Sequence, residues 1–437
     1  MTKMMTRALL AGAALLPSLA VAQDMTGMDH SGHDMAAMDH GSHAMTMTGL
    51  LGPYPMSREA SGTAWQPDSA GHDGVHFAVG NWSLMAHGNA TLVVDDQGGA
   101  RGGRKTFSES MAMLMGSRKL GDSDTLALRA MVSLDALMGR RGYPLLFATG
   151  ETADGATGLV DRQHPHDLFM ELAASWSRDL GGGRAVSLYA GLPGEPALGP
   201  PTFMHRVSGM DNPEAPISHH WFDSTHITFG VVTAGYSTAA WKFEASAFKG
   251  REPDQRRWNL ESPKLDSWSV RAFWNPTADL SLQASTGHLN SPEQLHPEKD
   301  EQRTTLSATW AKPLGDKRLL AATLAWSNKD LRPGPTLTAW LAEGALKLGP
   351  DTVFARAERK QDDELFENQP ASPLHEVPVT VNKVSLGYFR TLPVAANVKL
   401  DVGGLASAYA YPTALETAYG KDGVKSFMLF ARVKLGS

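Results

Sequence analysis

The sequence predicts an all-β protein: a transmembrane antiparallel β-barrel of about 16 strands (14–18), preceded by a disordered tail rich in methionine and histidine. Three observations predict this fold. From about residue 75 onward, apolar and polar residues alternate with a period of two, as in strands that have one apolar face. Short turns alternate with long loops along this part of the chain, and tryptophans recur at both ends of the apolar faces.

Residues 1–22 have the pattern of a secretory signal peptide. Two basic residues precede an apolar stretch at 8–19, and an A-V-A cleavage site follows at 20–22. That stretch is too short to span a membrane, and no later segment is long and apolar enough to do so as a helix. The 437 residues include no cysteine, so no disulfide holds the fold, and the net charge of −6 gives no reason to expect nucleic acid as a partner.

A disordered Met/His-rich metal-binding tail and linker is expected over residues 23–74. It contains two copies of the unit DMxxMDHxxH, at 24–33 and 34–43. Thioether sulfur suits Cu(I), whereas imidazole suits Cu(II) and several other divalent ions. The repeat of both ligand types therefore favours copper ions, with no organic cofactor and with Asp29 and Asp39 as auxiliary ligands; the alternative is a solvated linker of biased composition. The predicted copper ligands are Met25, Met28, His30, His33, Met35, Met38, His40, His43, Met45 and Met47.

Residues 75–437 are expected to form the barrel, in contact with the lipids of the outer membrane of a Gram-negative bacterium. In one segment, for example, Val353 and Ala355 face one side, and Phe354 and Arg356 face the other. The expected strands are 75–86, 104–119, 124–137, 168–180, 185–192, 224–235, 238–249, 265–275, 279–288, 302–313, 317–327, 335–348, 351–361, 380–391, 396–408 and 424–435.

The connections between these strands alternate in length. Every second connection is a short turn, and the connections between them are longer loops. The longest loops are expected at 138–167 and 193–223. Because the short side of such barrels is periplasmic, an even number of strands places both termini, and hence the tail, in the periplasm. The chain ends in K-L-G-S, whereas outer-membrane barrels usually end in an aromatic residue. The short turns are expected at 120–123, 181–184, 236–237, 276–278, 314–316, 349–350 and 392–395.

The tryptophans of the apolar faces predict two aromatic belts at the membrane–water interfaces. Trp268 and Trp326 lie at the strand ends away from the short turns. Those that lie beside a short turn are Trp176, Trp241, Trp274 and Trp310.

The histidines of the two longest loops are candidates for a second metal site at the mouth of the barrel. His164 and His166 belong to one loop, and His219, His220 and His226 to the next. If they converge with a carboxylate, they can bind a divalent transition metal. In the alternative interpretation they are polar residues that form hydrogen bonds inside the barrel and fold both loops inward as a constriction.

Methionines and charges on the strands suggest two further properties of the lumen. Met111, Met113 and Met115 share one face of a strand, and Met131 lies on its neighbour, so a ladder of soft ligands is one interpretation and ordinary packing the other. Lumen-side charges of both signs predict weak solute selectivity and salt bridges across the barrel. These charges are Arg129, Asp135, Lys242, Glu244, Arg271, Arg356, Glu358, Lys360 and Lys383.

Enzymatic signatures are absent from the sequence, so no enzyme is expected. It contains neither GxSxG nor HExxH. The run Asp223-Ser224-Thr225-His226 supplies the residue types of a hydrolase triad, but neighbours on one extended strand point in opposite directions.

The tail resembles the Met/His/Asp-rich N-terminal segment of the bacterial copper resistance protein B family. The resemblance covers about residues 24–49, on the runs MDHS at 28–31 and MDHG at 38–41, with Met25 and Met35 upstream. Members of that family are outer-membrane proteins of copper tolerance, so the resemblance implies this role. The barrel portion is similar to an uncharacterised family of bacterial outer-membrane proteins, in the blocks RQHPHD at 162–167 and HHWFDSTH at 219–226.

Together these features predict an outer-membrane barrel that binds copper through its periplasmic tail and contributes to copper tolerance by sequestration or transport. Periplasmic copper-handling proteins are candidate partners. The alternatives are a general diffusion porin with an incidental tail, an outer-membrane hydrolase that uses Ser224, and an adhesion or structural barrel.

Overall fold

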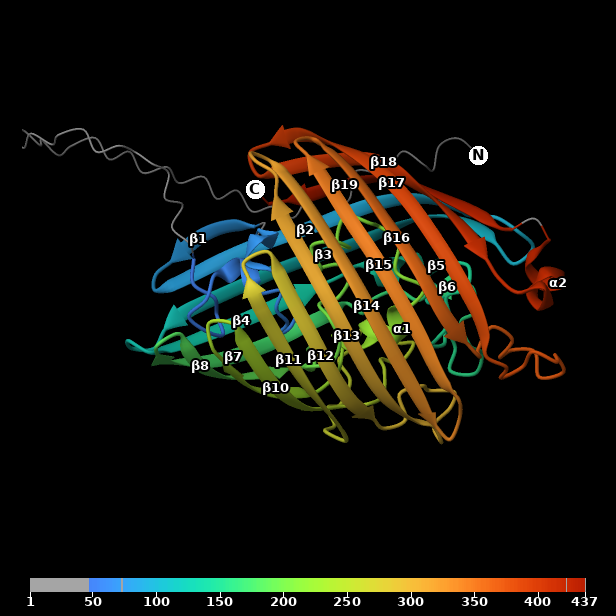
Figure 1. The fold of residues 1–437 in the computed structure, drawn as a ribbon, viewed down its shortest axis with the longest axis horizontal. Helices are drawn as coiled ribbons and strands as arrows, with labels where there is room; N and C mark the ends of the chain where they lie inside the picture. The colour runs from blue at the N-terminus through green and yellow to red at the C-terminus, as the bar shows by residue number, and fades with distance from the viewer. Residues whose placement is uncertain (1–46, 72–73, 422, 437) are drawn as a thin grey trace, which may run out of the picture. The chain divides into compact units, whose positions relative to one another are not determined.

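The described residues of the computed structural model, 47–71, 74–421 and 423–436, form a closed antiparallel β-barrel of 16 strands, which confirms the predicted fold class. Each strand pairs with the next along the chain, and β19 pairs with β2 to close the ring (Figure 1). The barrel strands are β2 (Trp82–Gln97), β3 (Gly103–Lys119), β4 (Asp124–Val132), β7 (Phe169–Gly181), β8 (Arg184–Gly191), β9 (Val231–Ser237), β10 (Trp241–Phe248), β11 (Ser267–Thr277), β12 (Leu280–Leu289), β13 (Asp300–Pro313), β14 (Arg318–Arg332), β15 (Thr336–Leu348), β16 (Asp351–Asp362), β17 (Val379–Ala395), β18 (Val398–Ala410) and β19 (Lys425–Leu435).

The remaining elements are short. β1 (Val75–Val79) forms a hairpin with the start of β2, next to the end of β19, and β5 (Tyr143–Pro144) pairs with β6 (Arg162–Gln163) in a connection. No helix of the described part is long and apolar enough to span a membrane. The helices are α1 (His219–Phe222), α2 (Glu416–Tyr419) and the 3-10 turns η1 (Met56–Arg58), η2 (Asp68–Ala70), η3 (Asp135–Met138), η4 (Ser224–His226) and η5 (Thr413–Leu415).

Alternation along the strands separates an apolar outer face from a charged inner face. On β16, Val353 and Ala355 are exposed, whereas Phe354, Arg356 and Glu358 are buried inside the barrel. A side-chain period of two makes this separation unavoidable once one face is buried. The large apolar side chains of the outer face lie where a barrel of this kind meets hydrocarbon.

Tryptophans mark the two ends of this outer face. Trp241 and Trp274 stack on each other beside short turns, with ring centroids 5.1 Å apart. Trp326 and Trp340 meet at 6.5 Å on two other neighbouring strands. Both pairs of rings lie on the side of the sheet that carries the exposed apolar residues, as membrane-interface anchors do.

Several strand boundaries differ from the sequence prediction; β14, for example, extends to Arg332 and β17 to Ala395, beyond their expected ends at 327 and 391. The segment 75–86 is not one strand, because Gly80 has φ +57° and turns the chain between β1 and β2. The segment 124–137 ends as a strand at Val132, and 224–235 begins as one only at Val231, since both loops leave the wall early to enter the lumen. The expected turn at 236–237 lies at 238–240, and the connection between β14 and β15 has only three residues, 333–335.

Residues 47–71, expected within the disordered tail and linker, are folded inside the barrel at the end where the short turns lie. Leu50, Tyr54 and Trp65 pack against Met115 and Phe273 of the barrel wall. Strand charges also hold this segment, because Lys242 Nζ donates to the carbonyl of Thr63 and Arg271 Nη2 donates to its hydroxyl at 3.0 Å. The lumen is thus occupied by the chain's own N-terminal segment, which we call the plug (residues 47–71).

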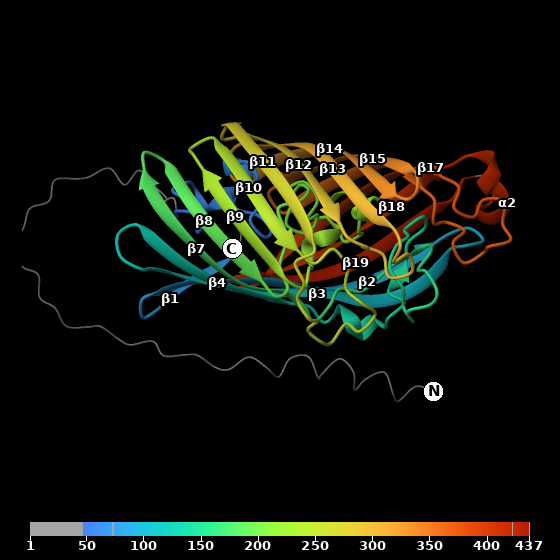
Figure 2. The same cartoon turned by 90° about the horizontal axis from the view of Figure 1, so that it is seen from below.

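The two longest connections also fold into the barrel, where α1 lies among the strands (Figures 1 and 2). Trp221 and Phe222 of α1 pack against Leu331, Leu337 and Leu341 of the wall. Apolar side chains in a connection that would otherwise be exposed explain why this loop turns inward.

Inward-facing charges of the strands pair with these loops and with neighbouring strands, and not across an open lumen as we expected. Glu343 binds Arg206 of the loop at 2.6 Å and Arg356 of the next strand at 3.0 Å. Lys383 binds Glu214 of the same loop at 2.6 Å. A buried charge needs such a partner, so the pattern of wall charges fixes the path of the loop.

Candidate metal centre

Five histidines from the two longest loops come together inside the barrel. His226 lies between His166 and His219, with ring centroids 5.4 Å and 5.2 Å away. His220 and His164 lie beside them, with centroids 5.4 Å from His219 to His220 and 5.7 Å from His164 to His220. The rings are therefore packed side by side, with neighbouring centroids 5.2–5.7 Å apart.

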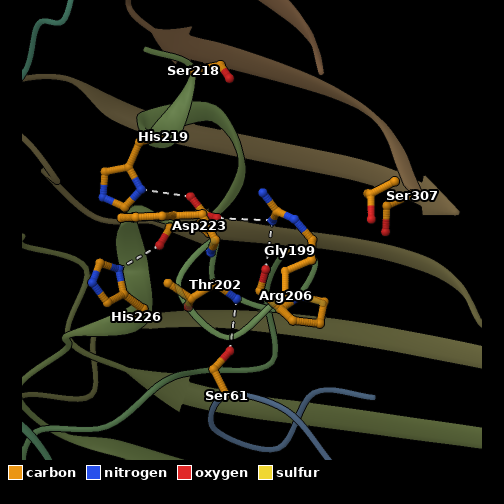
Figure 3. A network of polar contacts seen from close by, with 12 residues as sticks. Ser61, Gly199, Thr202, Arg206, Ser218, His219, Asp223, His226 and Ser307 are labelled. Carbon is orange, nitrogen blue, oxygen red and sulfur yellow. Dashed lines mark hydrogen bonds and ion pairs between the residues drawn. The ribbon is translucent and has the colours of Figure 1, made fainter. Parts of the chain in front are cut away.

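Three of the histidines are oriented through Nδ1. His219 and His166 donate from Nδ1 to carboxylates, at 2.7 Å to Asp223 Oδ1 and at 2.8 Å to Asp135 Oδ2. His226 Nδ1 donates to the backbone carbonyl of Asp223 at 2.8 Å. In Figure 3, the imidazoles of His219 and His226 contact Asp223 on one side, and the guanidinium of Arg206 contacts it on the other. Because the acceptors fix the proton on Nδ1, Nε2 keeps its lone pair.

The three Nε2 atoms are buried and unused. Nε2 of His166, His219 and His226 has no hydrogen-bond partner within the described part of the chain. Leaving a buried polar atom unpaired costs about 1–3 kcal/mol. Nδ1 bound to a carboxylate or carbonyl with Nε2 free is the arrangement of histidines that ligate metals. We refer to these three residues as the histidine trio.

The barrel wall holds two members of the trio, His219 and His226, in place through Asp223. Its Oδ2 accepts from Arg206 Nη1 at 3.2 Å and from the backbone N–H of Phe203 at 2.9 Å. Arg206 in turn binds Glu343 of β15. The position of Asp223 is thus fixed from the strand through the loop, one helical turn after His219.

Burial favours the neutral, metal-binding form of the His219 and His226 imidazoles. Desolvation lowers the pKa of His226 well below its ordinary value, and a charge on His219 adds to this effect. Desolvation also lowers the pKa of His219, against the opposing hydrogen bond and charge of Asp223. Burial alone would raise the pKa of Asp223, but the hydrogen bond from His219 and the guanidinium of Arg206 bring it to about 2. Since a neutral His219 carries no charge, its hydrogen bond and Arg206 keep Asp223 ionised.

Methionine side chains lie near two histidines of the trio, His166 and His226. Met111, Met131 and Met170 form a buried apolar cluster with Ile227, which follows His226 in the chain. A cavity of about 70 Å³ is lined by His166 together with the side chains of Met111, Met204 and Met210, among others. Met111, Met113 and Met131 therefore face the lumen near the trio, whereas Met115 packs against the plug. Imidazole together with thioether is a ligand set suited to both oxidation states of copper.

Other predicted residues lie elsewhere. The tail ligands from Met25 to Met45 lie outside the described residues, and Met47 is 43% exposed. Three other histidines lie apart from the cluster. His288 lies near Asp300 and His296 near Glu367, and His375 bonds the backbone carbonyl of Phe366.

The Asp-Ser-Thr-His run does not form a catalytic triad. The Ser224 hydroxyl accepts a hydrogen bond from Arg303 at 3.0 Å, and the Asp223 carboxylate binds His219 and Arg206. His226 uses Nδ1 on a backbone carbonyl, and its Nε2 meets no hydroxyl of the described residues.

Several neighbours of the cluster were not predicted from the sequence. Asp135 was taken for a strand residue, and it lies in η3 where it orients His166. His87, whose ring lies 5.9 Å from His205, falls in a segment expected to be a loop. The one available signal was the short spacing of Asp223 after His219, since residues four apart share one side of a helical turn.

Comparison with solved structures supports the fold alone. The barrel resembles Pseudomonas putida OprB, solved at high pH, with a TM-score of 0.50, 11% identity and coverage of 82% of this chain and 94% of that one. It is also similar to Salmonella typhi OmpF in complex with daunomycin (TM-score 0.49, 8% identity, 83% and 100% covered). An anion-selective porin from Comamonas acidovorans is similar with a TM-score of 0.46 and 11% identity. The match covers 82% of this chain and 100% of that one. No family model and no curated protein sequence matches the chain.

Proposed function

We propose that this protein is a copper-binding outer-membrane barrel that contributes to copper tolerance by sequestering copper or passing it through the lumen. The observation that carries the proposal is the histidine trio, whose three buried Nε2 atoms are oriented and unpartnered in the described structure. Nearby thioethers favour copper over zinc, because zinc sites in proteins are built from imidazole, thiolate and carboxylate.

The tail and the trio would act as two separate copper-binding elements. Six methionines and four histidines of the tail offer Cu(I) and Cu(II) ligands in a segment that needs no core. The trio offers three imidazoles held by hydrogen bonds, of which His219 and His226 are buried and His166 is half-buried.

Copper titration of full-length variants in detergent tests the proposal. The parent protein for these variants is the full chain with the six Met and four His of residues 24–47 replaced. We call it the tail-substituted protein. It should still bind copper tightly, and adding His166→Gln, His219→Gln and His226→Gln should abolish that binding. His375→Gln is the matched control, since this histidine bonds a backbone carbonyl outside the cluster. Equal copper binding by the triple variant and the control would refute a role for the trio.

Growth of a deletion strain across graded copper concentrations tests the role in the cell. Complementation by the wild-type gene should restore tolerance, and the tail-substituted and trio variants should each restore less. Full tolerance with both elements removed would refute the contribution to copper tolerance.

General diffusion is the second candidate function, and the porin-like fold favours it. Planar-bilayer conductance separates the two. A large current in ordinary salts that copper leaves unchanged is expected of a diffusion porin, whereas a lumen occupied by the plug and loops should conduct poorly.

A further inference from the structure

We propose that His220, Glu252 and Glu293 form a second metal site, for a divalent cation of the zinc type, which joins three loops of the barrel. It goes beyond the proposed copper binding, because it uses no residue of the trio and no thioether. Its ligands are one imidazole and two carboxylates, a harder set than that of the trio.

The three ligands converge from three different connections. His220 belongs to α1 between β8 and β9, Glu252 follows β10, and Glu293 follows β12. One ligand atom of each lies within 4.8 Å of those of the other two. Nδ1 of His220 is 3.2 Å from Oε1 of Glu252 and 3.9 Å from Oε1 of Glu293. Three nitrogen and oxygen ligands that leave one position open form a set that Zn²⁺ accepts.

Two of the three ligand side chains are buried and lack hydrogen bonds, whereas Glu293 is half-buried. His220 is 5% exposed and Glu252 is 8% exposed. Neither ring nitrogen of His220 and neither carboxylate oxygen of Glu252 has a hydrogen-bond partner among the described residues. An isolated buried carboxylate is costly, and a cation bound by both carboxylates removes that cost.

Nearby basic side chains are engaged by another acid. Arg303 Nε binds Glu301 Oε1 at 2.5 Å, and Lys329 Nζ lies 3.5 Å from the other oxygen of Glu301. Arg303 and Lys329 act on Glu252 and Glu293 only through their charge, since no ion pair among the described residues joins them to either carboxylate. A charged His220 paired with Glu252 is the competing explanation, and it predicts no effect of zinc.

A cavity with an excess of carboxylates adjoins Glu293. Lys299, which lies in its lining, is bound to Glu376 at 3.1 Å, and His296 lies 3.2 Å from Glu367. An excess of carboxylates in a partly enclosed space attracts divalent cations. The ionisable residues of the lining are Glu293, His296, Lys299, Asp363, Glu364, Glu367 and Glu376.

Zinc titration of the tail-substituted full chain tests the proposal, with the copper ligands of the tail absent. The variant Glu252→Gln/Glu293→Gln should lose about one bound zinc per chain, and saturating zinc should raise the Tm of its parent but not of the variant. Glu298→Gln is the matched control, because this carboxylate lies on the same loop as Glu293 and is exposed. It should bind zinc like the parent.

Two further measurements separate this site from the trio. The His166/His219/His226→Gln variant should keep its zinc, and the Glu252/Glu293 variant should keep its copper. Circular dichroism and the thermal transition without metal report whether each variant still forms the barrel. Unchanged zinc binding by a folded Glu252→Gln/Glu293→Gln variant would overturn the second site and leave copper binding at the trio untouched. Loss of zinc only in the trio variant would overturn it as well.

Discussion

Asp223 accepts the Nδ1–H of His219 at 2.7 Å, four residues after it in the chain, and its backbone carbonyl accepts that of His226. One residue thus orients two histidines of the trio. Such outer carboxylates change metal affinity by about 10–100-fold in known sites.

Asp223→Asn should therefore weaken copper binding to the tail-substituted protein by about 10–100-fold, because a neutral amide holds the imidazole less firmly. The measurement is copper titration in detergent. Asp300→Asn is the control, since Asp300 lies 3.6 Å from His288, away from the trio. If both variants bind copper like their parent, Asp223 does not position the trio.

Arg206→Met should loosen the loop between β8 and β9. The guanidinium joins Asp223 to Glu343, and both side chains of the Arg206–Glu343 pair are only 1% exposed. Removing one member of a buried pair costs about 3–5 kcal/mol, because the other charge stays buried. Limited proteolysis of the folded barrel should show faster cleavage within 192–230. Arg359→Met, on the outer face, should leave the cleavage rate unchanged.

Trp65→Ala should release the plug and increase ion conductance. Trp65 is 1% exposed, and its ring meets Tyr54 at 4.9 Å and Phe273 of the wall at 6.3 Å between centroids. Truncating a buried aromatic residue costs about 3–5 kcal/mol. Single-channel recordings in planar bilayers measure the effect, with the exposed Trp258→Ala as control. An equally small current in both variants would mean that the plug does not limit the lumen.

Strand order and facing could be predicted because they depend on local patterns. On β16, the alternation of Val353, Phe354, Ala355 and Arg356 is enough to tell the outer face from the inner. The boundaries of β1 and β2 could not be predicted in this way, since residues on both sides of Gly80 are apolar enough to continue a strand. Leu50, Tyr54 and Trp65 were a signal that the expected linker could pack, because large apolar residues are depleted in disordered segments.

The spacing of the histidines along the sequence could not predict that they meet, because closure of the barrel brings the two loops together. His166 and Asp135 are separated by 31 residues, and the wall charges that draw the loops inward lie on strands far along the chain. Glu252 and Glu293 gave no signal of their own, since isolated glutamates in loops are ordinary solvent-exposed residues. The trio and the second site therefore became visible only in three dimensions.

Leu386→Arg should destabilise the barrel in lipid. Leu386 lies on the outer face of β17 and is 61% exposed, a position that faces hydrocarbon if the barrel spans a membrane. An arginine at the lipid face near the bilayer midplane costs about 2–4 kcal/mol. Urea titration of protein folded into vesicles measures this loss of unfolding free energy. Leu137→Arg is the control, because Leu137 is 67% exposed but belongs to η3, outside the barrel wall. Equal unfolding free energies for the two variants would contradict a lipid-facing outer surface, since water would then solvate both arginines alike.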